Sequence, residues 1–344
     1  MYSWKTVLVT IGLLFTLKIW NPYFVENISW SWFDYLHSTH SVQEYNPESG
    51  LPEIVLVDID EKSVEQYGQL PFPRKIYADK MLESHWSNTY VFTQVFSEPD
   101  RFGGDEEFAT ALVNRLSILS SAPTIQTDKG SSPFVGTSTL GSGDAKNAVW
   151  GTPGVLSPIP ILEGNTYGVG VTTATPSQSG TPNFDGTIRS APLLMQANGQ
   201  IYPSLAVEVL RAYNDEKSYQ MKVTEEVGVE WVRVGRQKPI STTPQGDLMI
   251  SYWNKFKRYS FTDELPENSI LVFGVTAEGL NNPVSTPMGT MYPHEVQANL
   301  IQTALTGIQI KQSYFLEFVE VVLLLAVLVI VLVMVYKLPT ALSG

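Results

Sequence analysis

Two carboxylates stand at the end of the first strongly apolar segment of the chain. Asp58 lies within the segment 54–59, and Asp60 follows it directly. Paired carboxylates can perform acid–base chemistry when a nucleophile or a metal ion lies beside them. The surrounding sequence suggests neither, and the chain contains no GxSxG nucleophile elbow and no HExxH motif. We therefore predict a protein that is not an enzyme, with no catalytic residues, metal or cofactor, in which the carboxylates serve ligand recognition.

The same segment indicates where a ligand would bind. Its unbroken apolar run is typical of a strand buried on both faces, and open parallel sheets bind ligands at the carboxyl ends of their strands. Arg74, Glu98 and Asp100 lie in loops that could converge on that edge. We predict a polar pocket here, in which Arg74 binds an anionic or carbonyl group beside the two aspartates. The alternative is that these residues cap helices and pair with one another to fix loops.

Four further residues are candidate ligand contacts, and each has a structural alternative. Arg189 follows a predicted β-turn and could instead be one half of a buried ion pair. Tyr202 and Ser204 flank a proline at a predicted helix start, where they could bind an anion or simply shape the turn. Thr276 begins a glycine-bearing turn after the apolar segment 270–275, and this turn lacks a complete nucleotide-binding pattern.

The composition narrows the classes of partner. The chain carries 22 lysines and arginines against 34 aspartates and glutamates, which gives a formal net charge of −12. Nucleic acid is excluded as a partner, because its phosphates repel so acidic a protein. The chain contains no cysteine, so that it forms neither disulfides nor thiolate metal sites, and its four histidines show no zinc-binding spacing.

Alternating strand and helix patterns in the middle of the chain predict an α/β fold. A strand at 54–59, helices at 61–67 and 75–86 and a strand at 90–95 form one parallel βαβ unit. Loops and edge strands are expected in the glycine- and serine-rich region 128–183. The other predicted elements are helices at 103–116, 203–213 and 294–306, and strands at 167–173, 188–195, 229–235, 247–253 and 270–275. We expect a mixed, partly parallel sheet with flanking helices.

Two uncharged apolar stretches, 6–17 and 321–336, bracket this region. Each is predicted to lie in a transmembrane helix, because with its flanking residues it approaches the roughly 20 residues that cross a bilayer. For the first stretch a cleaved signal peptide is the alternative, although no small-residue cleavage site follows it. Both ends would lie on one side of the membrane and the α/β region on the other. The predicted segments are a transmembrane helix at 1–23, a stalk and linker at 24–52, a domain at 53–312, a second transmembrane helix at 313–337 and a cytoplasmic stub at 338–344.

Five segments resemble one known family, in the family's order: 54–74, 96–100, 185–192, 201–205 and 274–299. They are similar to the CHASE2 domain, an extracytoplasmic sensor module of bacterial transmembrane receptors. The chain departs from the family's usual residues at Leu70, Phe72, Asn282, Pro293 and Gln297. The resemblance implies a domain on the periplasmic side of the bacterial inner membrane, joined to a cytoplasmic cyclase or kinase that this chain does not contain.

The resemblance also implies a function. The protein would detect an envelope or external cue, a small molecule or a periplasmic protein, and relay it across the lipid bilayer. The predicted helix at 294–306 lies a few residues before the second apolar stretch, so that a shift of this helix would reach the membrane. The aromatic stalk, 24–36, offers a surface for a homodimer. Two alternatives stay open: a membrane-anchored interaction or scaffold module of an envelope assembly, and an extracytoplasmic hydrolase with convergent carboxylates in a deep pocket.

Overall fold

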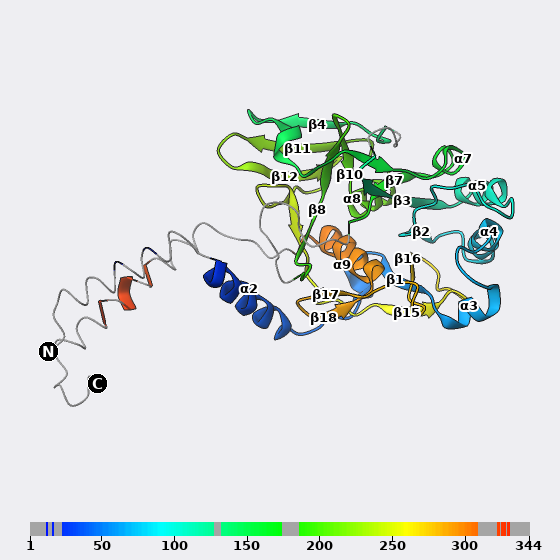
Figure 1. Cartoon of the computed structure of the whole chain (residues 1–344), viewed down its shortest axis with the longest axis horizontal. Coiled ribbons are helices and arrows are strands. Elements are labelled where there is room, and N and C mark those ends of the chain that lie inside the picture. The colour runs from blue at the N-terminus through cyan, green and yellow to red at the C-terminus, as the bar shows by residue number, and fades with distance from the viewer. Residues whose placement is uncertain are drawn as a thin grey trace. The chain divides into compact units, whose positions relative to one another are not determined.

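The computed structural model describes residues 23–126, 132–173 and 186–308 (Figure 1). It also describes isolated positions in the terminal stretches, at 12, 16, 322–323, 325–327 and 329–330. Most residues of the two predicted transmembrane helices, and the predicted stub, lie outside the described residues. Within the described part, no helix has the length and apolar character needed to cross a bilayer.

The chain divides into two compact units. One consists of Met1–Thr39 together with Lys311–Gly344, and the other, called here the sheet unit, of His40–Ile310. The first unit contains helix α2 (Tyr23–Ser38), on which the aromatic stalk predicted from the sequence falls. The candidate ligand-binding residues all belong to the sheet unit, which is described by itself below.

A seven-stranded sheet forms the centre of the sheet unit. Its strand order is β15-β1-β16-β2-β3, and β7 and β6 both pair with β3. Every pair is parallel except that of β3 with β6. The strands are β1 (Glu53–Ile59), β2 (Thr89–Phe92), β3 (Leu116–Thr124), β6 (Gly154–Leu156), β7 (Gly168–Val171), β15 (Lys257–Ser260) and β16 (Ser269–Val275). The predicted α/β class with a mixed, partly parallel sheet is confirmed.

Strand β1 is buried on both faces because its side chains alternate between two hydrophobic cores. Ile54 and Leu56 enter one core, and Val55, Val57 and Ile59 enter the other. The first core also contains side chains of α8 and α9, and we call that side of the sheet the α9 face. The second contains side chains of α4 and α5, and we call that side the α4 face. The helices are α3 (Glu61–Tyr67), α4 (Arg74–Glu83), α5 (Asp105–Val113), α8 (Leu205–Tyr213) and α9 (Pro293–Thr306).

Smaller sheets continue from the core on the α9 face, since buried residues of β11 and β12 belong to the same cluster as those of α8 and α9. One has the order β13-β12-β11-β4, another β10-β9-β5, and two are the strand pairs β14-β8 and β17-β18. The strands are β4 (Thr137–Leu140), β5 (Gly151–Thr152), β8 (Ser190–Pro192), β9 (Leu194–Ala197), β10 (Gln200–Pro203), β11 (Tyr219–Thr224), β12 (Gly228–Val234), β13 (Ile240–Ser241), β14 (Asp247–Met249), β17 (Val284–Thr286) and β18 (Gly289–Met291). The short helices are η1 (Pro47–Ser49), α6 (Ala145–Ala148) and α7 (Pro160–Glu163).

Two glycines of β7 let helix α8 lie directly on the sheet. A Cβ added at Gly168 would lie 2.0 Å from Oε1 of Glu208, and one at Gly170 would lie 2.4 Å from Cα of Leu205. Both distances are shorter than any van der Waals contact, so that larger residues would push α8 away from β7. The close approach buries the carboxylate of Glu208, which pairs with Arg211 at 2.7 Å.

Several elements differ from the prediction. The predicted strand at 188–195 is two strands, β8 and β9, and neither β11 nor β15 was predicted. Pro203, which was expected to open a helix, is the last residue of β10, and the helix begins after its cap Ser204. Strand β3 was not predicted, because Ser117 and Ser120 interrupt its apolar pattern. These serines are buried and satisfy their hydroxyls within the fold; Ser120 donates to the carbonyl oxygen of Phe92 at 2.6 Å.

Candidate functional site

Asp58 is the centre of a polar cluster between the sheet and α9. It follows Leu56 on the α9 face and accepts two hydrogen bonds from the guanidinium of Arg258 on β15, at 2.9 and 3.2 Å. Nε2 of His294, in the first turn of α9, lies 2.8 Å from Oδ1 of Asp58. Glu295 accepts a further bond from Arg258 at 2.8 Å. These four charged or titratable side chains, the Asp58 cluster, hold the start of α9 against β1 and β15.

His294 is fully buried, which is possible because β16 has a glycine beside it. Gly274 is the register partner of Asp58, and a Cβ added there would lie 2.2 Å from Cγ of His294. The side chain of Asp58 is only 14% exposed. Burial alone would raise the pKa of Asp58, but hydrogen bonds from His294 and Arg258 outweigh burial and lower this pKa below its ordinary value. The carboxylate is therefore ionised at neutral pH.

Asp60 and Thr276 lie at the same end of the sheet and serve local structure. Oδ1 of Asp60 accepts from the amide N–H of Ser63 at 2.9 Å, which makes Asp60 the N-cap of α3. The same oxygen accepts from the hydroxyl of Ser260 at 2.9 Å. The amide N–H of Thr276 donates to the carbonyl oxygen of Ile59 at 2.9 Å and so extends the pairing of β16 with β1. The contacts of Asp60 match the structural alternative, and a role of either residue in ligand binding stays a prediction.

The structure brings Arg74, Glu98 and Asp100 together at the start of α4. Asp100 accepts the amide N–H of Arg74 at 2.8 Å, and the guanidinium donates to the carbonyl oxygen of Glu98 at 3.3 Å. The guanidinium also lies 4.5 Å from the ring centre of Phe96 and 3.7 Å from Asp105. Burial opposes ionisation of Asp100, but three backbone N–H groups and the nearby arginine lower its pKa. The side chain of Arg74 is 8% exposed, so that its contacts are mostly internal.

This group and the Asp58 cluster do not form one pocket. Asp58 lies on the α9 face, whereas α4, which begins at Arg74, packs on the opposite face through residues such as Tyr77. Strand β16 also lies between β1 and β2, which separates those strands by about 10 Å. The expected convergence on a single edge pocket is thus replaced by two separate groups. A role of either group in ligand binding stays a prediction.

The other three candidate residues lie elsewhere in the sheet unit. Arg189 is buried directly before β8, and the β-turn predicted ahead of it begins outside the described residues. The hydroxyl of Tyr202 on β10 donates to Oε1 of Gln200 at 3.4 Å. The hydroxyl of Ser204 accepts the amide N–H of Val207 at 3.4 Å and caps α8. These residues stay candidates for ligand contact, with structural contacts that the sequence also allowed.

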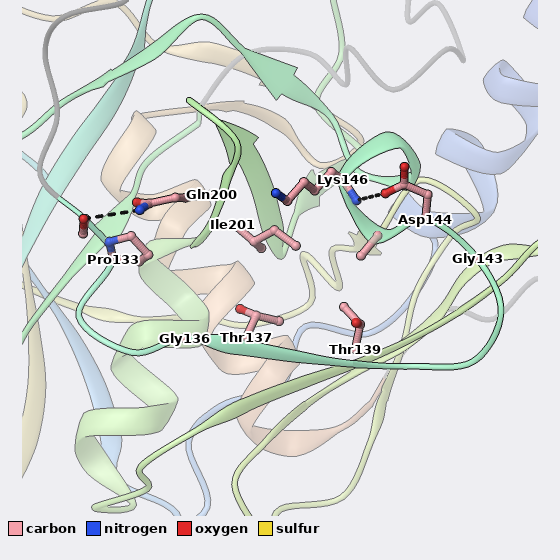
Figure 2. A pocket seen from close by; sticks show the side chains of 11 residues that line it. Pro133, Gly136, Thr137, Thr139, Gly143, Asp144, Lys146, Gln200 and Ile201 are labelled. Atoms are coloured by element: carbon pink, nitrogen blue, oxygen red, sulfur yellow. Dashed lines mark hydrogen bonds between the residues drawn. The ribbon is translucent and has the colours of Figure 1, made fainter.

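A surface pocket that the sequence did not indicate lies among the smaller sheets (Figure 2). Its volume is about 590 Å³, and β4, β10 and the chain around α6 line it. The polar side chains of the lining are Ser132, Thr137, Thr139, Asp144, Lys146 and Gln200. No motif marks these residues, which come from two stretches of the chain, 132–146 and 200–201, that only the fold brings together.

The Asp58 cluster is suited to holding a helix, and the surface pocket is suited to binding a small molecule. Within the described ranges, no group of three or more histidine and carboxylate side chains is placed to hold a metal ion. The Asp58 cluster fixes α9 on the sheet by charge, and the pocket offers hydroxyl, amide and ammonium groups to a solute.

One family matches the chain over nearly its whole length. The CHASE2 domain matches residues 6–336. No curated protein and no solved structure shows significant similarity to the chain. CHASE2 domains are extracellular sensor domains of receptors. The protein belongs to the CHASE2 domain family.

Proposed function

We propose that this chain is the sensing region of a bacterial membrane receptor, which detects an extracytoplasmic cue and passes the signal inward through α9. The observation that carries the proposal is the placement of this helix. It begins in the Asp58 cluster, packs against β1, β16 and α8, and ends at Thr306. The predicted second transmembrane helix, 313–337, follows within a few residues. A displacement of α9 within the sheet unit would therefore act on the membrane segment.

Polar contacts fix both ends of α9. The Asp58 cluster holds the first turn, and near the last turn Thr303 accepts the amide N–H of Ser251 at 3.0 Å. The hydroxyl of Ser251 donates to the carbonyl oxygen of Ile308 at 3.0 Å, just beyond the helix. Hydrogen bonds are directional, so that a sliding or rotation of the helix would break these contacts together. Such a helix suits a two-state relay of the shear or rotation type.

In this proposal the apolar segments at 1–23 and 313–337 span the inner membrane and the sheet unit lies in the periplasm. The cue is a small molecule or a periplasmic protein, and the receiver is a cytoplasmic cyclase or kinase. The length and apolar character of the two sequences support the placement. The sensory role of the family supports a binding function, rather than a catalytic one.

A homodimer would form through α2. Ile28, Trp32, Tyr35 and Leu36 are all at least half exposed on this helix and recur at the spacing of one helical face. In detergent we expect a particle of twice the chain mass of 38.2 kDa. Glutamates in place of Ile28 and Trp32 should yield monomers, because like charges would face each other across the seam. A wild-type protein that is monomeric by mass photometry would contradict the dimer.

The relay can be tested without knowing the cue. The full chain is fused at its C-terminus to a diguanylate cyclase, and cyclic dinucleotide is measured in cells. Gly274→Ala should change the basal output, because it forces His294 out of the Asp58 cluster. Insertion of three glycines after Gly307 should cancel this change, since a flexible joint no longer transmits the position of α9.

The control is the same insertion after Glu226, in the exposed turn between β11 and β12. It should leave the effect of Gly274→Ala intact. If the insertion after Gly307 also leaves the effect intact, α9 does not carry the signal. An output that responds to neither change would favour the scaffold alternative, in which the sheet unit holds an envelope partner.

A further inference from the structure

We propose that the pocket between β4, α6 and β10 binds a small hydroxylated carboxylate, of the sugar-acid class. The proposal deepens the sensory function above, on which it rests, by naming the chemistry of the cue. The pocket has a volume of about 590 Å³, within the range of about 300–1,000 Å³ that is usual for small-molecule sites. Its chemistry follows from four features of the lining.

The first feature is an ammonium group without a partner carboxylate. Most described lysines of the sheet unit form salt bridges. Lys146 forms none with the described residues, and its side chain extends across the pocket toward Gln200 (Figure 2). A Cβ added at Gly199 would lie 4.0 Å from Nζ of Lys146, which places the ammonium beside the β9–β10 turn. In so acidic a protein, this cation selects for a negatively charged group on the ligand.

The second feature is a row of hydroxyls on β4. Side chains alternate along a strand, so that Thr137 and Thr139 point into the pocket while Ser138 donates to the carbonyl oxygen of Tyr219 on the other side. Oγ1 of Thr137 is buried, whereas Thr139 is exposed at the pocket surface. The hydroxyl of Thr139 can therefore pair with a hydroxyl of the ligand.

The third feature is an amide that can bind alcohols as donor and acceptor. Nε2 of Gln200 lies 3.4 Å from Oγ of Ser132, and Oε1 accepts from Tyr202 at 3.4 Å. Both bonds are long, and they orient the amide without saturating it. Gln200 and Ser132 therefore add groups that suit ligand hydroxyls at the end of the pocket reached by Lys146.

The fourth feature is the remainder of the lining, which consists of one carboxylate and a few aliphatic side chains. The carboxylate of Asp144 accepts the amide N–H of Lys146 at 3.0 Å and a bond from Asn147 at 2.7 Å, so that each of its oxygens bonds to a residue of α6. The apolar part of the lining consists of the aliphatic side chains of Pro133, Ala145 and Ile201, and no aromatic ring contributes. A ligand with one carboxylate and several hydroxyls fits this lining better than an aromatic or cationic one.

The pocket is connected to α9 through contiguous packing. Ile201 lines the pocket and also belongs to the buried cluster that contains Leu300 and Ile301 of α9. The chain passes from Ile201 into the cap Ser204 of α8, and α8 packs against α9. A ligand that moves β10 would thus act on both helices of the α9 face.

Calorimetric titration of the detergent-solubilised full chain with D-glucuronate, D-galacturonate and D-gluconate tests the site. At least one acid should bind, and Lys146→Met should weaken its binding by about tenfold or more, since a charge-assisted hydrogen bond is lost. Thr139→Val, which preserves shape, should weaken binding severalfold. Lys238→Met is the matched control, because Lys238 is exposed outside the pocket and pairs with no described carboxylate; it should bind as wild type.

Four results would overturn the assignment: no acid binds, Lys146→Met binds as wild type, D-glucose binds as tightly as D-glucuronate, or inorganic phosphate does. The binding site and the relay are distinguished by the cyclase fusion. An acid that binds through Lys146 yet leaves cyclase output unchanged would support the site and refute its role as the receptor's input. If an acid binds and changes cyclase output in the wild-type fusion, but no longer changes it in the fusion with glycines inserted after Gly307, both the binding site and the relay are supported.

Discussion

At the scale of single residues, a cluster of charged side chains joins apolar packing in fixing the start of α9. Asp58 receives bonds from two cationic or titratable side chains that come from elements far away in the sequence. The position of Asp58 at the end of a buried strand could be predicted from the apolar run before it. Its partners could not, because His294 lies 236 residues away and only the register of β1 with β16 brings it near. A local sequence pattern carries no information on such a contact.

Asp58→Asn should lower the free energy of unfolding at neutral pH by about 2–4 kcal/mol, because His294 and Arg258 lose a charged acceptor. Folding lowers the pKa of Asp58. The carboxylate therefore stabilises the fold fully at pH values above its ordinary pKa, and this stabilisation is lost as the pH falls through the lower pKa of the folded protein. The stability difference between wild type and variant should therefore stay constant above about pH 5 and shrink as the pH falls below about 4. The range below about pH 4 is the one that tests the charge. Urea unfolding at several pH values measures it. A difference that stays constant over this range would show that the carboxylate charge is not what stabilises the cluster.

Gly274→Ala should destabilise the protein by about 1–3 kcal/mol, because the added methyl group overlaps the ring of His294. Thermal unfolding of Gly136→Ala supplies the control. A Cβ at Gly136 would meet no atom within 4 Å, and that variant should unfold as wild type. Equal unfolding midpoints for Gly274→Ala and wild type would refute the close packing of α9 on β16.

At the scale of elements, the predictable strands are those whose side chains are apolar on both faces. Strands β1 and β16 are of this kind and were predicted within a residue or two. Strand β3 escaped prediction because its buried serines bond to backbone carbonyls, and β15 because it is a mostly exposed, charged edge strand. Strands β3 and β15 both depend on contacts with neighbouring strands, and the spacing of apolar residues in the sequence does not reveal such contacts.

Helix α8 depends on one buried ion pair. Burial raises the pKa of Glu208, and Arg211 opposes that rise. Arg211→Met should lower the free energy of unfolding by about 3–5 kcal/mol at neutral pH, because it leaves a buried carboxylate unpaired. A carboxyl whose pKa is raised by folding stabilises the fold more as pH falls, so the deficit should shrink in acid as Glu208 takes up a proton.

The variant with both Arg211→Met and Glu208→Gln provides the control, measured by urea unfolding alongside the single variant. It should recover part of the lost stability at neutral pH and show less dependence on pH. If the single and double variants are equally unstable at every pH, the loss comes from the arginine's packing and not from an unpaired charge.

At the scale of the whole molecule, a sheet unit with a hydrophobic core on each face of its central sheet lies between two apolar terminal segments in the sequence. The alternation of strand and helix patterns was enough to predict the α/β class, and the order of the family's motifs was enough to predict the CHASE2 family. The pocket with Lys146 was not predictable, since its walls come from segments without a motif. A receptor of the proposed kind requires the sheet unit to lie outside the cytoplasmic membrane and both termini to lie in the cytoplasm.

Labelling of single cysteines tests this arrangement most directly, because the natural chain has none. Lys238→Cys, Ser3→Cys and Ser343→Cys are expressed separately and treated with a membrane-impermeant maleimide, before and after the cells are permeabilised. We expect Lys238→Cys to react before permeabilisation, and the two terminal cysteines to react only after it. A protected Lys238→Cys, or terminal cysteines that react on opposite sides of the membrane, would contradict an extracytoplasmic sensor.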